Sequence, residues 1–176
     1  ARQVSRWTKQ YRNSETENIS SMNNLIDWLP ENLPSEKPIR LVHGDFSLTN
    51  VIVNTENNKI ASILDWELST LGDPVADFSY HCLQYFINPI LSDPQKCKDL
   101  NIPDLNKYVE MYIENSEFKI SESEWNTYMA FSMFKLAAIL QGITGRVRDG
   151  TAAGKDADKL FPQTVMLADL GWTFVE

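Results

Sequence analysis

Asp45, Asn50 and Asp65 are three residues whose types and spacing suit the chemistry of phosphoryl transfer. That reaction needs a carboxylate that orients an attacking hydroxyl and accepts its proton, and it needs hard oxygen ligands for a Mg²⁺ ion that neutralises phosphate charge. Asp45 can supply the carboxylate. Asn50 offers a neutral carbonyl oxygen and Asp65 an anionic one, so the two can share one ion without excess repulsion. The pattern predicts a magnesium-assisted phosphoryl-transfer centre.

Short strands and a hairpin are expected to position these residues. Apolar, β-branched runs at residues 39–42, 51–53 and 59–64 predict three strands. A turn-forming Thr-Glu-Asn-Asn stretch separates the second run from the third, which predicts a hairpin. The hairpin would bring Asp65 back to Asn50, although the two are far apart in the sequence.

The other segments have the apolar spacing and the capping residues of helices. A stripe through residues 22, 25, 26 and 29 predicts a helix that ends at Pro30. After residue 64 the sequence predicts helix to the end of the chain. Asp73 with the proline that follows it marks one helix start, expected to lead into residues 75–86, and Asp104 marks another.

A capping box at Ser121 and Glu124 predicts the start of a long helix. Gly142 and Gly145 lie where that helix is expected to close. The polar residues 145–158 are then expected to form a mobile loop, and a last helix is expected from about residue 158 to residue 174.

Composition predicts one globular domain over residues 1–176, since the chain has 43% hydrophobic and 23% charged residues. The expected fold class is α+β and mostly helical. A net charge of −8 argues against a general binder of nucleic acid, and no apolar run approaches the roughly 20 residues of a membrane span. Cys82 and Cys97 have neither metal-ligand spacing nor a disulfide framework, which predicts an intracellular location and leaves the organelle open.

The His-Gly-Asp-x-x-x-x-Asn motif at residues 43–50 resembles the catalytic loop of the aminoglycoside phosphotransferase and choline kinase group, relatives of the protein kinases. Asp-Trp-Glu at residues 65–67 takes the place of the kinase Asp-Phe-Gly. The stretch 64–77 most resembles the phosphotransferase domain attached to acyl-CoA dehydrogenase family proteins, and the Trp-Leu-Pro-Glu-Asn run at 28–32 fits the same branch. The specific match covers about residues 42–85.

This resemblance implies a role for each matching residue. Asp45 would be the catalytic base, while Asn50 and Asp65 would bind the metal and thereby the nucleotide. Asp77 would anchor the catalytic loop by accepting backbone hydrogen bonds, and His43 would pack beneath the loop. The implied cofactors are ATP and Mg²⁺, and the implied acceptor is the hydroxyl of a small molecule. The dehydrogenase-linked branch suggests hydroxyacyl compounds, with aminoglycoside-like or choline-like acceptors as the alternative.

The chain departs from the kinase pattern at its N-terminal side. A kinase has an N-terminal lobe with a glycine-rich loop and a strand lysine, whereas no glycine-rich loop precedes His43 and neither Lys9 nor Lys37 lies in a strand-like run. We therefore expect the C-terminal (large) lobe of a protein-kinase-like fold, in which a small β-hairpin carries the catalytic loop. The missing N-terminal lobe and a flanking acyl-CoA dehydrogenase domain are implied partners. The chain begins at Ala1, as a processed chain or a piece of a longer one would, and alone it is expected to be inactive.

Each candidate residue also has a structural interpretation. Asp45 and Asn50 could cap local amides at a turn, and Asp65 could cap a helix. Glu67 either approaches the metal or a substrate group, or faces solvent. Asp73 is expected to be only a helix cap.

Several residues outside the motif have a similar ambiguity. His81 is expected to be a packing or hydrogen-bonding residue. Arg146 and Arg148 either bind an anionic substrate tail or interact with the dipole of their helix. An aromatic set is expected in the core, with some members lining an acceptor pocket: Tyr80, Tyr85, Phe86, Tyr108 and Tyr112.

Two other functions compete with a small-molecule kinase. A non-catalytic binding or scaffolding module could keep the same fold, although it would have no physical need for Asp45, Asn50 and Asp65 together. A metal-dependent phosphate-ester hydrolase would need more metal ligands than this loop offers, and the chain has only two histidines.

Overall fold

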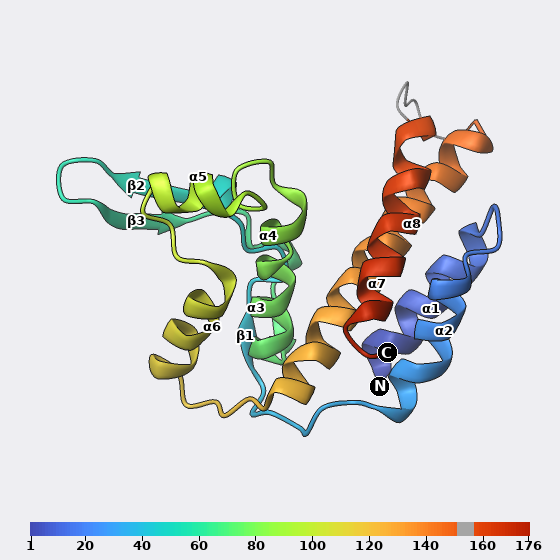
Figure 1. Ribbon diagram of the computed structural model, residues 1–176, viewed down its shortest axis with the longest axis horizontal. Helices are drawn as coiled ribbons and strands as arrows, with labels where there is room; N and C mark the ends of the chain where they lie inside the picture. The colour runs from blue at the N-terminus through green and yellow to red at the C-terminus, as the bar shows by residue number, and fades with distance from the viewer. Residues whose placement is uncertain (151–156) are drawn as a thin grey trace. The chain divides into compact units, whose positions relative to one another are not determined.

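The chain divides into two compact units in the computed structural model, which describes residues 1–150 and 157–176 (Figure 1). The first unit comprises Ala1–Ser35 and Ser121–Glu176, and the second comprises Glu36–Ile120. Helices dominate both, and the described strands are short and lie in the second unit. The predicted α+β, mostly helical class is confirmed.

The first unit is built from helices of the two ends of the chain. They are α1 (Arg2–Ser14), α2 (Ser20–Trp28) with the 3-10 turn η1 (Leu29–Glu31), α7 (Glu122–Arg148) and α8 (Ala157–Thr173). Figure 1 shows α7 running beside α8 and α1, and these helices pack directly on one another. The predicted helices at 22–29 and at 158–174 are confirmed as α2 and α8.

One hydrophobic core holds this unit together, and the predicted stripe of α2 lies within it. Met22, Leu25 and Leu29 are fully buried. They pack with residues of α1, α7 and α8, which include Val4, Tyr11, Ala130, Phe134, Ala137, Ala138, Leu167 and Ala168. Because the core joins segments from both ends of the chain, neither end can form it alone.

The long helix α7 begins as predicted but ends later. The Ser121 hydroxyl accepts a hydrogen bond from the Glu124 amide at 3.2 Å, and the Glu124 carboxylate accepts one from the Ser121 amide at 3.1 Å, which confirms the capping box. The helix then continues past Gly142 and Gly145 to Arg148. The predicted end was wrong because these glycines serve the close approach of α1 and do not terminate the helix.

The loop predicted at residues 145–158 overlaps two helices at its ends, and that part of the prediction is wrong. Residues 145–148 belong to α7, and the described part of α8 begins at Ala157. Residues 151–156 lie outside the described residues.

The second unit contains two antiparallel strand pairs. Strand β2 (Val51–Asn54) pairs with β3 (Lys59–Ile63), which confirms the predicted hairpin. Strand β1 (Arg40–Val42) pairs with β4 (Thr70–Gly72). The sequence predicted helix after residue 64, so β4 corrects that prediction. A three-residue strand is too short to show periodicity, and only its pairing with β1 defines it.

The helices of the second unit are short. They are α3 (Pro74–Cys82), α4 (Gln84–Ile87), α5 (Pro94–Asp99) and α6 (Leu105–Glu114). The single helix expected at 75–86 is divided at Leu83 into α3 and α4. The predicted start of α6 is confirmed, since Asp104 accepts a hydrogen bond from the backbone of Lys107 at 2.9 Å.

Helix α5 was not predicted as a separate helix, although it begins with the same signal as α3. Asp73 accepts hydrogen bonds from the amides of Val75 and Ala76, and Asp93 caps α5 in the same way. In both helices a proline follows the capping aspartate, which suits the first helical position. The six-residue length of α5 leaves too few turns for an apolar stripe, so the cap was its only signal in the sequence.

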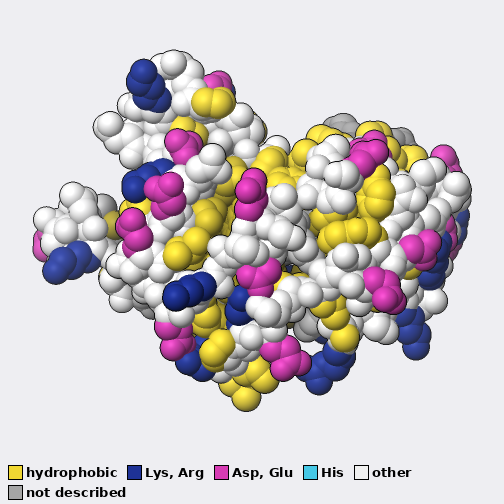
Figure 2. Space-filling model, turned by 60° about the horizontal axis from the view of Figure 1, so that its bottom comes forward, with side chains coloured by type: hydrophobic (Ala, Val, Ile, Leu, Met, Phe, Trp, Pro, Cys, Tyr) yellow, Lys and Arg dark blue, Asp and Glu magenta, His cyan; other side chains and the backbone are white. Residues whose placement is uncertain are grey.

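Cys82 and Cys97 are both buried free thiols. Acidic and basic side chains are interspersed with hydrophobic ones on the face shown in Figure 2. In residues 1–150 and 157–176, no helix is both long enough and apolar enough to cross a membrane.

Candidate active site

The predicted catalytic loop lies between β1 and β2 and begins with a tight backbone turn. Gly44 has φ +84°, a conformation that side chains disfavour. A Cβ at this position would lie 2.4 Å from the backbone oxygen of Leu68. The glycine of the His-Gly-Asp motif is therefore required by both the turn and the close approach of another backbone segment.

Asp77, in the first turn of α3, holds this turn in place. One carboxylate oxygen accepts the backbone N–H of His43 at 3.0 Å, and the other accepts that of Gly44 at 2.9 Å. Hydrogen bonds to an ionised carboxylate are among the stronger ones in proteins. These are the backbone contacts that the family resemblance implied for Asp77, and they tie the start of the loop to α3.

His43 links the loop to the segment that carries Asp65. The residue is buried, with an exposed fraction of 4%. Nε2 lies 2.8 Å from the carbonyl oxygen of Leu64, and Nδ1 lies 3.4 Å from the backbone nitrogen of Asp45. A neutral ring with its proton on Nε2 satisfies both contacts, donating to Leu64 and accepting from Asp45. Trp66 covers the ring at a centroid distance of 4.8 Å.

Asn50 closes the loop in the 3-10 turn η2 (Leu48–Asn50). Its side-chain Nδ2 donates to the carbonyl oxygen of Asp45 at 3.0 Å. The backbone carbonyl of Asn50 accepts the N–H of Leu64 at 2.8 Å. With Nδ2 turned to Asp45, the amide presents Oδ1 as the atom that can meet a hard cation.

Asp65 has a strained backbone, with φ 65° and ψ 50° in the left-handed region. Aspartate tolerates this region better than most residues, but the conformation still requires support. The 3-10 turn η3 (Trp66–Leu68) follows directly, and the indole N–H of Trp66 donates to the carbonyl of Ile63 at 2.8 Å. Trp66 therefore supports both Asp65 and His43, a role that the sequence analysis missed.

The side chains available for chemistry are accessible. Asp45, Asp65 and Glu67 are exposed, and Asn50 is half-buried. The structure brings the segments of Asp45, Asn50 and Asp65 together through the contacts of Leu64 with Asn50 and His43. Glu67 lies in η3, and its contact with a metal or a substrate stays a prediction.

Tyr80 is a further residue near the predicted base. Burial, together with the smaller effect of the nearby charge of Asp45, raises the pKa of Tyr80 to about 12. The phenol therefore stays protonated at neutral pH and can donate a hydrogen bond. Tyr80 follows Asp77 by one helical turn, so both residues lie on the same face of α3. This spacing was the signal in the sequence that could have identified Tyr80 as a residue near the site and not a core aromatic.

A cavity of about 480 Å³ lies against the catalytic loop within the second unit. His43, Phe46 and Trp66 contribute to its wall, together with aromatic residues of α3 and α6. In that wall Phe78 and Tyr112 stack with ring centroids 3.8 Å apart. Tyr108 and Tyr112 of the aromatic set line this cavity, in keeping with the expectation that some members of the set line a pocket.

His81 packs in the same wall. Its Nδ1 lies 3.1 Å from the carbonyl oxygen of Phe46, and its Nε2 lies 3.2 Å from the hydroxyl of Tyr108. Burial lowers the pKa of His81, so the neutral ring is favoured at neutral pH. These contacts give His81 the packing and hydrogen-bonding position that the sequence predicted.

The donor set suits Mg²⁺ bound together with a nucleotide. The described residues, 1–150 and 157–176, hold no group of three or more His, Cys, Asp and Glu side chains that could bind a metal ion. Mg²⁺, however, is usually bound by one or two protein oxygens and by substrate phosphates. Oδ1 of Asn50 and the carboxylate of Asp65 fit that pattern.

The fold and the loop are those of a kinase-like phosphotransferase. A crystal structure from Ralstonia eutropha, provisionally assigned as an aminoglycoside phosphotransferase, superposes with a TM-score of 0.89 at 42% identity. The match covers 98% of this chain and 54% of the other. Residues 1–96 match the family model described as the phosphotransferase enzyme family. The chain belongs to the phosphotransferase enzyme family.

Two curated relatives place the chain in one branch of that family. Acyl-CoA dehydrogenase family member 10 of Mus musculus is 46% identical over 98% of this chain. Acyl-CoA dehydrogenase family member 11 of Homo sapiens is 34% identical over 89% of it. The chain spans only 17% and 20% of the lengths of these two proteins. The resemblance to the branch named for acyl-CoA dehydrogenases is confirmed.

Proposed function

We propose that this chain is the catalytic lobe of a small-molecule kinase, which transfers the γ-phosphoryl group of ATP to a hydroxyl with the help of Mg²⁺. The observation that carries the proposal is the double hydrogen bond from the backbone of His43 and Gly44 to Asp77. These bonds hold the loop in a shape that leaves the side chain of Asp45 exposed. In the same shape the side-chain amide of Asn50 donates to the backbone carbonyl of Asp45.

Asp45 is the proposed catalytic base. Its exposed carboxylate would orient the acceptor hydroxyl and accept its proton as the phosphorus–oxygen bond forms. Tyr80, with its pKa raised to about 12, would remain a neutral donor beside that carboxylate. A neutral neighbour suits a base that must stay ionised at neutral pH.

Asn50 and Asp65 are the proposed ligands of Mg²⁺ and, through it, of ATP. Bound Mg²⁺ would supply charge neutralisation to the phosphates. The strained backbone of Asp65 supports a functional role, since such strain persists only where the surrounding structure over-determines it. The indole of Trp66 and the ring of His43 supply that support.

The acceptor is proposed to be a hydroxyacyl compound. The relatives named as acyl-CoA dehydrogenase family members support this class, since a linked dehydrogenase domain would act on acyl groups. The name of the Ralstonia structure supports an aminoglycoside as the alternative.

An N-terminal lobe and a flanking dehydrogenase domain are proposed partners within a longer protein. The chain matches 54% of the Ralstonia chain and about a fifth or less of its curated relatives, which supports this proposal. Without a lobe to cover the nucleotide phosphates, the isolated chain is expected to bind nucleotide weakly and to turn over poorly.

The test is acceptor-dependent ADP production by the full-length gene product with Mg²⁺·ATP. The panel contains hydroxyacyl, amino-alcohol and aminoglycoside compounds. Asp45→Asn should abolish transfer and leave nucleotide binding largely intact, whereas Asp65→Ala should weaken Mg²⁺·nucleotide binding. Asp99→Asn is the matched control, because Asp99 is an exposed carboxylate of the same unit. Wild-type turnover in both site variants would refute the assignment.

Nucleotide binding separates this proposal from its main rival. If Mg²⁺·nucleotide binds and no acceptor is turned over, the acceptor lies outside the panel. If no nucleotide binds to the full-length gene product, a non-catalytic binding module becomes the better description.

A further inference from the structure

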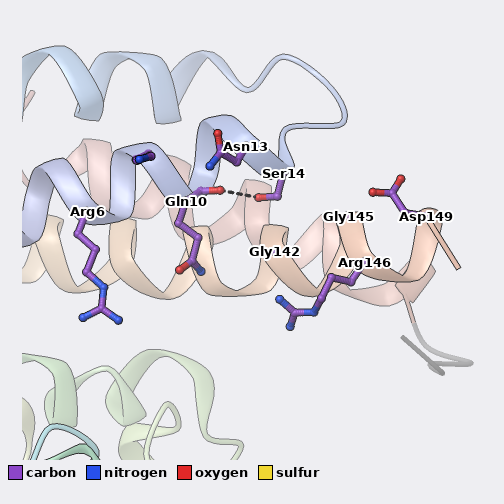
Figure 3. A pocket seen from close by; sticks show the side chains of 9 residues that line it. Arg6, Gln10, Asn13, Ser14, Gly142, Gly145, Arg146 and Asp149 are labelled. Carbon is purple, nitrogen blue, oxygen red and sulfur yellow. Dashed lines mark hydrogen bonds between the residues drawn. The ribbon is translucent and has the colours of Figure 1, made fainter. Parts of the chain in front are cut away.

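A groove of about 420 Å³ lies between α1 and α7 in the first unit (Figure 3). Small-molecule sites commonly measure about 300–1,000 Å³, so the groove is large enough to hold a ligand. It lies within one compact unit, and the catalytic loop lies in the other. The proposed function makes no use of it.

Cations line both walls of this groove. Arg6 and Lys9 come from α1, and Arg146 comes from the last turn of α7. Asp149 is an acidic lining residue, and its carboxylate pairs with Arg148, Nε to Oδ1 at 3.4 Å. The lining therefore carries a positive charge in a chain whose net charge is −8.

Two glycines give the groove its floor. A Cβ at Gly145 would lie 3.2 Å from both Cβ and the backbone oxygen of Ser14, so α1 and α7 touch at this point. A Cβ at Gly142 would lie 3.4 Å from Nε2 of Gln10, so the missing side chain leaves that amide accessible. The floor of the groove is therefore formed by helix backbone and the side-chain amide of Gln10. Larger side chains at Gly142 and Gly145 would fill this space.

The side chains of Arg6, Gln10 and Arg146 extend to the same side of this helix pair, as Figure 3 shows. Interaction with the dipole of α7 can account for Arg146, which lies near the C-terminus of that helix. It cannot account for Arg6 and Lys9, which lie in the middle of a different helix. Arg6 also lies over the ring of Trp7, with its guanidinium carbon 5.3 Å from the ring centroid. An anion between the two walls would meet cations from both helices.

We propose that this groove binds a phosphorylated small molecule through its phosphate groups. Guanidinium groups match phosphate oxygens with two parallel hydrogen bonds, and lysine adds a compact point charge. The amide of Gln10 adds a neutral donor on the same side. Two cationic walls favour a ligand with a diphosphate over one with a single phosphate.

The experiment is a calorimetric titration of the full-length gene product with inorganic pyrophosphate. EDTA is present, so binding does not depend on Mg²⁺ or on its proposed ligands. We expect saturable binding that weakens as salt is added. Inorganic phosphate and ADP form two further arms. Equal affinity for phosphate and pyrophosphate would identify a monophosphate site, and tighter binding of pyrophosphate and ADP would identify a diphosphate site.

Charge-removing variants locate the site. Arg6→Gln and Arg146→Gln should each weaken pyrophosphate binding at least about tenfold, because each removes a charge-assisted contact. Arg12→Gln is the matched control: Arg12 lies on the same helix α1, outside the groove lining, and pairs with Glu15 at 3.1 Å. It should leave the affinity unchanged. Pyrophosphate should also protect Lys9 from chemical acetylation, which reports on the groove without a substitution.

The proposal is overturned if pyrophosphate shows no saturable binding at millimolar concentrations. It is also overturned if Arg146→Gln binds as tightly as the wild type, or if Arg12→Gln loses as much affinity as Arg146→Gln. Asp65→Ala should retain pyrophosphate binding in EDTA. The experiment can therefore refute the phosphate-binding groove without refuting the proposed kinase centre, and the reverse is also true.

Discussion

The backbone carbonyl of Asn50 accepts the N–H of Leu64 at 2.8 Å, so the end of the catalytic loop is joined to the residue just before Asp65. His43 binds the carbonyl of the same Leu64 through Nε2 at 2.8 Å. Leu64 is thus bound on both its amide and its carbonyl side by residues of the loop. The β2–β3 hairpin brings the two proposed metal ligands together by this route.

Removing the carboxylate of Asp77 should loosen the loop. In Asp77→Ala the amides of His43 and Gly44 lose their acceptor, and we expect a loss of about 2–4 kcal/mol in the free energy of unfolding of the 176-residue chain. Asp77→Asn keeps one acceptor oxygen and should lose less. Urea unfolding measures both, and hydrogen exchange of the two amides reports the local effect. A wild-type exchange rate in Asp77→Ala would contradict this function of the carboxylate.

A side chain at Gly44 should be more costly than one at Gly150. Both glycines have positive φ, +84° and +70°, but a Cβ at Gly44 meets the backbone of Leu68 and one at Gly150 meets nothing within 4 Å. Gly150→Ala should therefore lose about 1 kcal/mol from backbone strain alone. Gly44→Ala should lose about 3 kcal/mol or more, since overpacking adds to the strain. If urea unfolding gave equal losses of stability for the two variants, the backbone at Leu68 would be able to move away from the new Cβ at no cost in free energy.

Tyr80 should report on the ionisation of Asp45. Burial is the main cause that raises the pKa of Tyr80 to about 12, and the Asp45 charge is the second. Asp45→Asn should therefore lower the pKa of Tyr80 while keeping it above the ordinary 10.0. An ultraviolet titration of tyrosinate, with Tyr80→Phe to identify the signal, measures this shift. An unchanged pKa would show that the two side chains do not interact.

The same group predicts a loss of stability in alkali. The pKa of Tyr80 is higher in the folded chain than in the unfolded one. The protonated phenol therefore makes its full contribution to the free energy of unfolding below pH 10, and this contribution is lost as the pH rises from about 10 to about 12. Tyr80→Phe should lose less stability over that interval than the wild type. Urea midpoints at several pH values measure the difference, and parallel curves would contradict it.

Alanine at the two groove glycines should have opposite effects. Gly142→Ala places Cβ in ordinary contact with Gln10 and should stabilise α7 by up to about 1 kcal/mol, since alanine favours a helix over glycine. Gly145→Ala places Cβ against the backbone of Ser14 and should lose about 1–3 kcal/mol. Thermal melting of the chain compares the pair. A gain in both variants would show that α1 can move away from α7.

Signals that lie within a few residues of one another were sufficient for much of the fold. The capping box of Ser121 and Glu124 placed the start of α7, and the turn residues between two β-branched runs placed the β2–β3 hairpin. These interactions form between near neighbours, so the sequence alone contains both partners. The resemblance of the loop motif to a known catalytic loop likewise pointed to the family, and the match of residues 1–96 to the family model confirms it.

Other features depended on partners far away in the chain. The strand β4 exists because it pairs with β1, about thirty residues earlier. Helix α7 continues past Gly145 because Ser14, at the other end of the chain, packs against that glycine.

The surroundings of the site were also decided in three dimensions. The shared role of Leu64, the support by Trp66 and the proximity of Tyr80 to Asp45 depend on turns whose backbone angles are set by tertiary contacts. The sequence by itself determined which chemical groups the chain carries and the local elements that hold them. Only the tertiary structure decided which of those groups meet, because a long-range contact is stable only when the whole unit has paid the entropy of bringing its segments together.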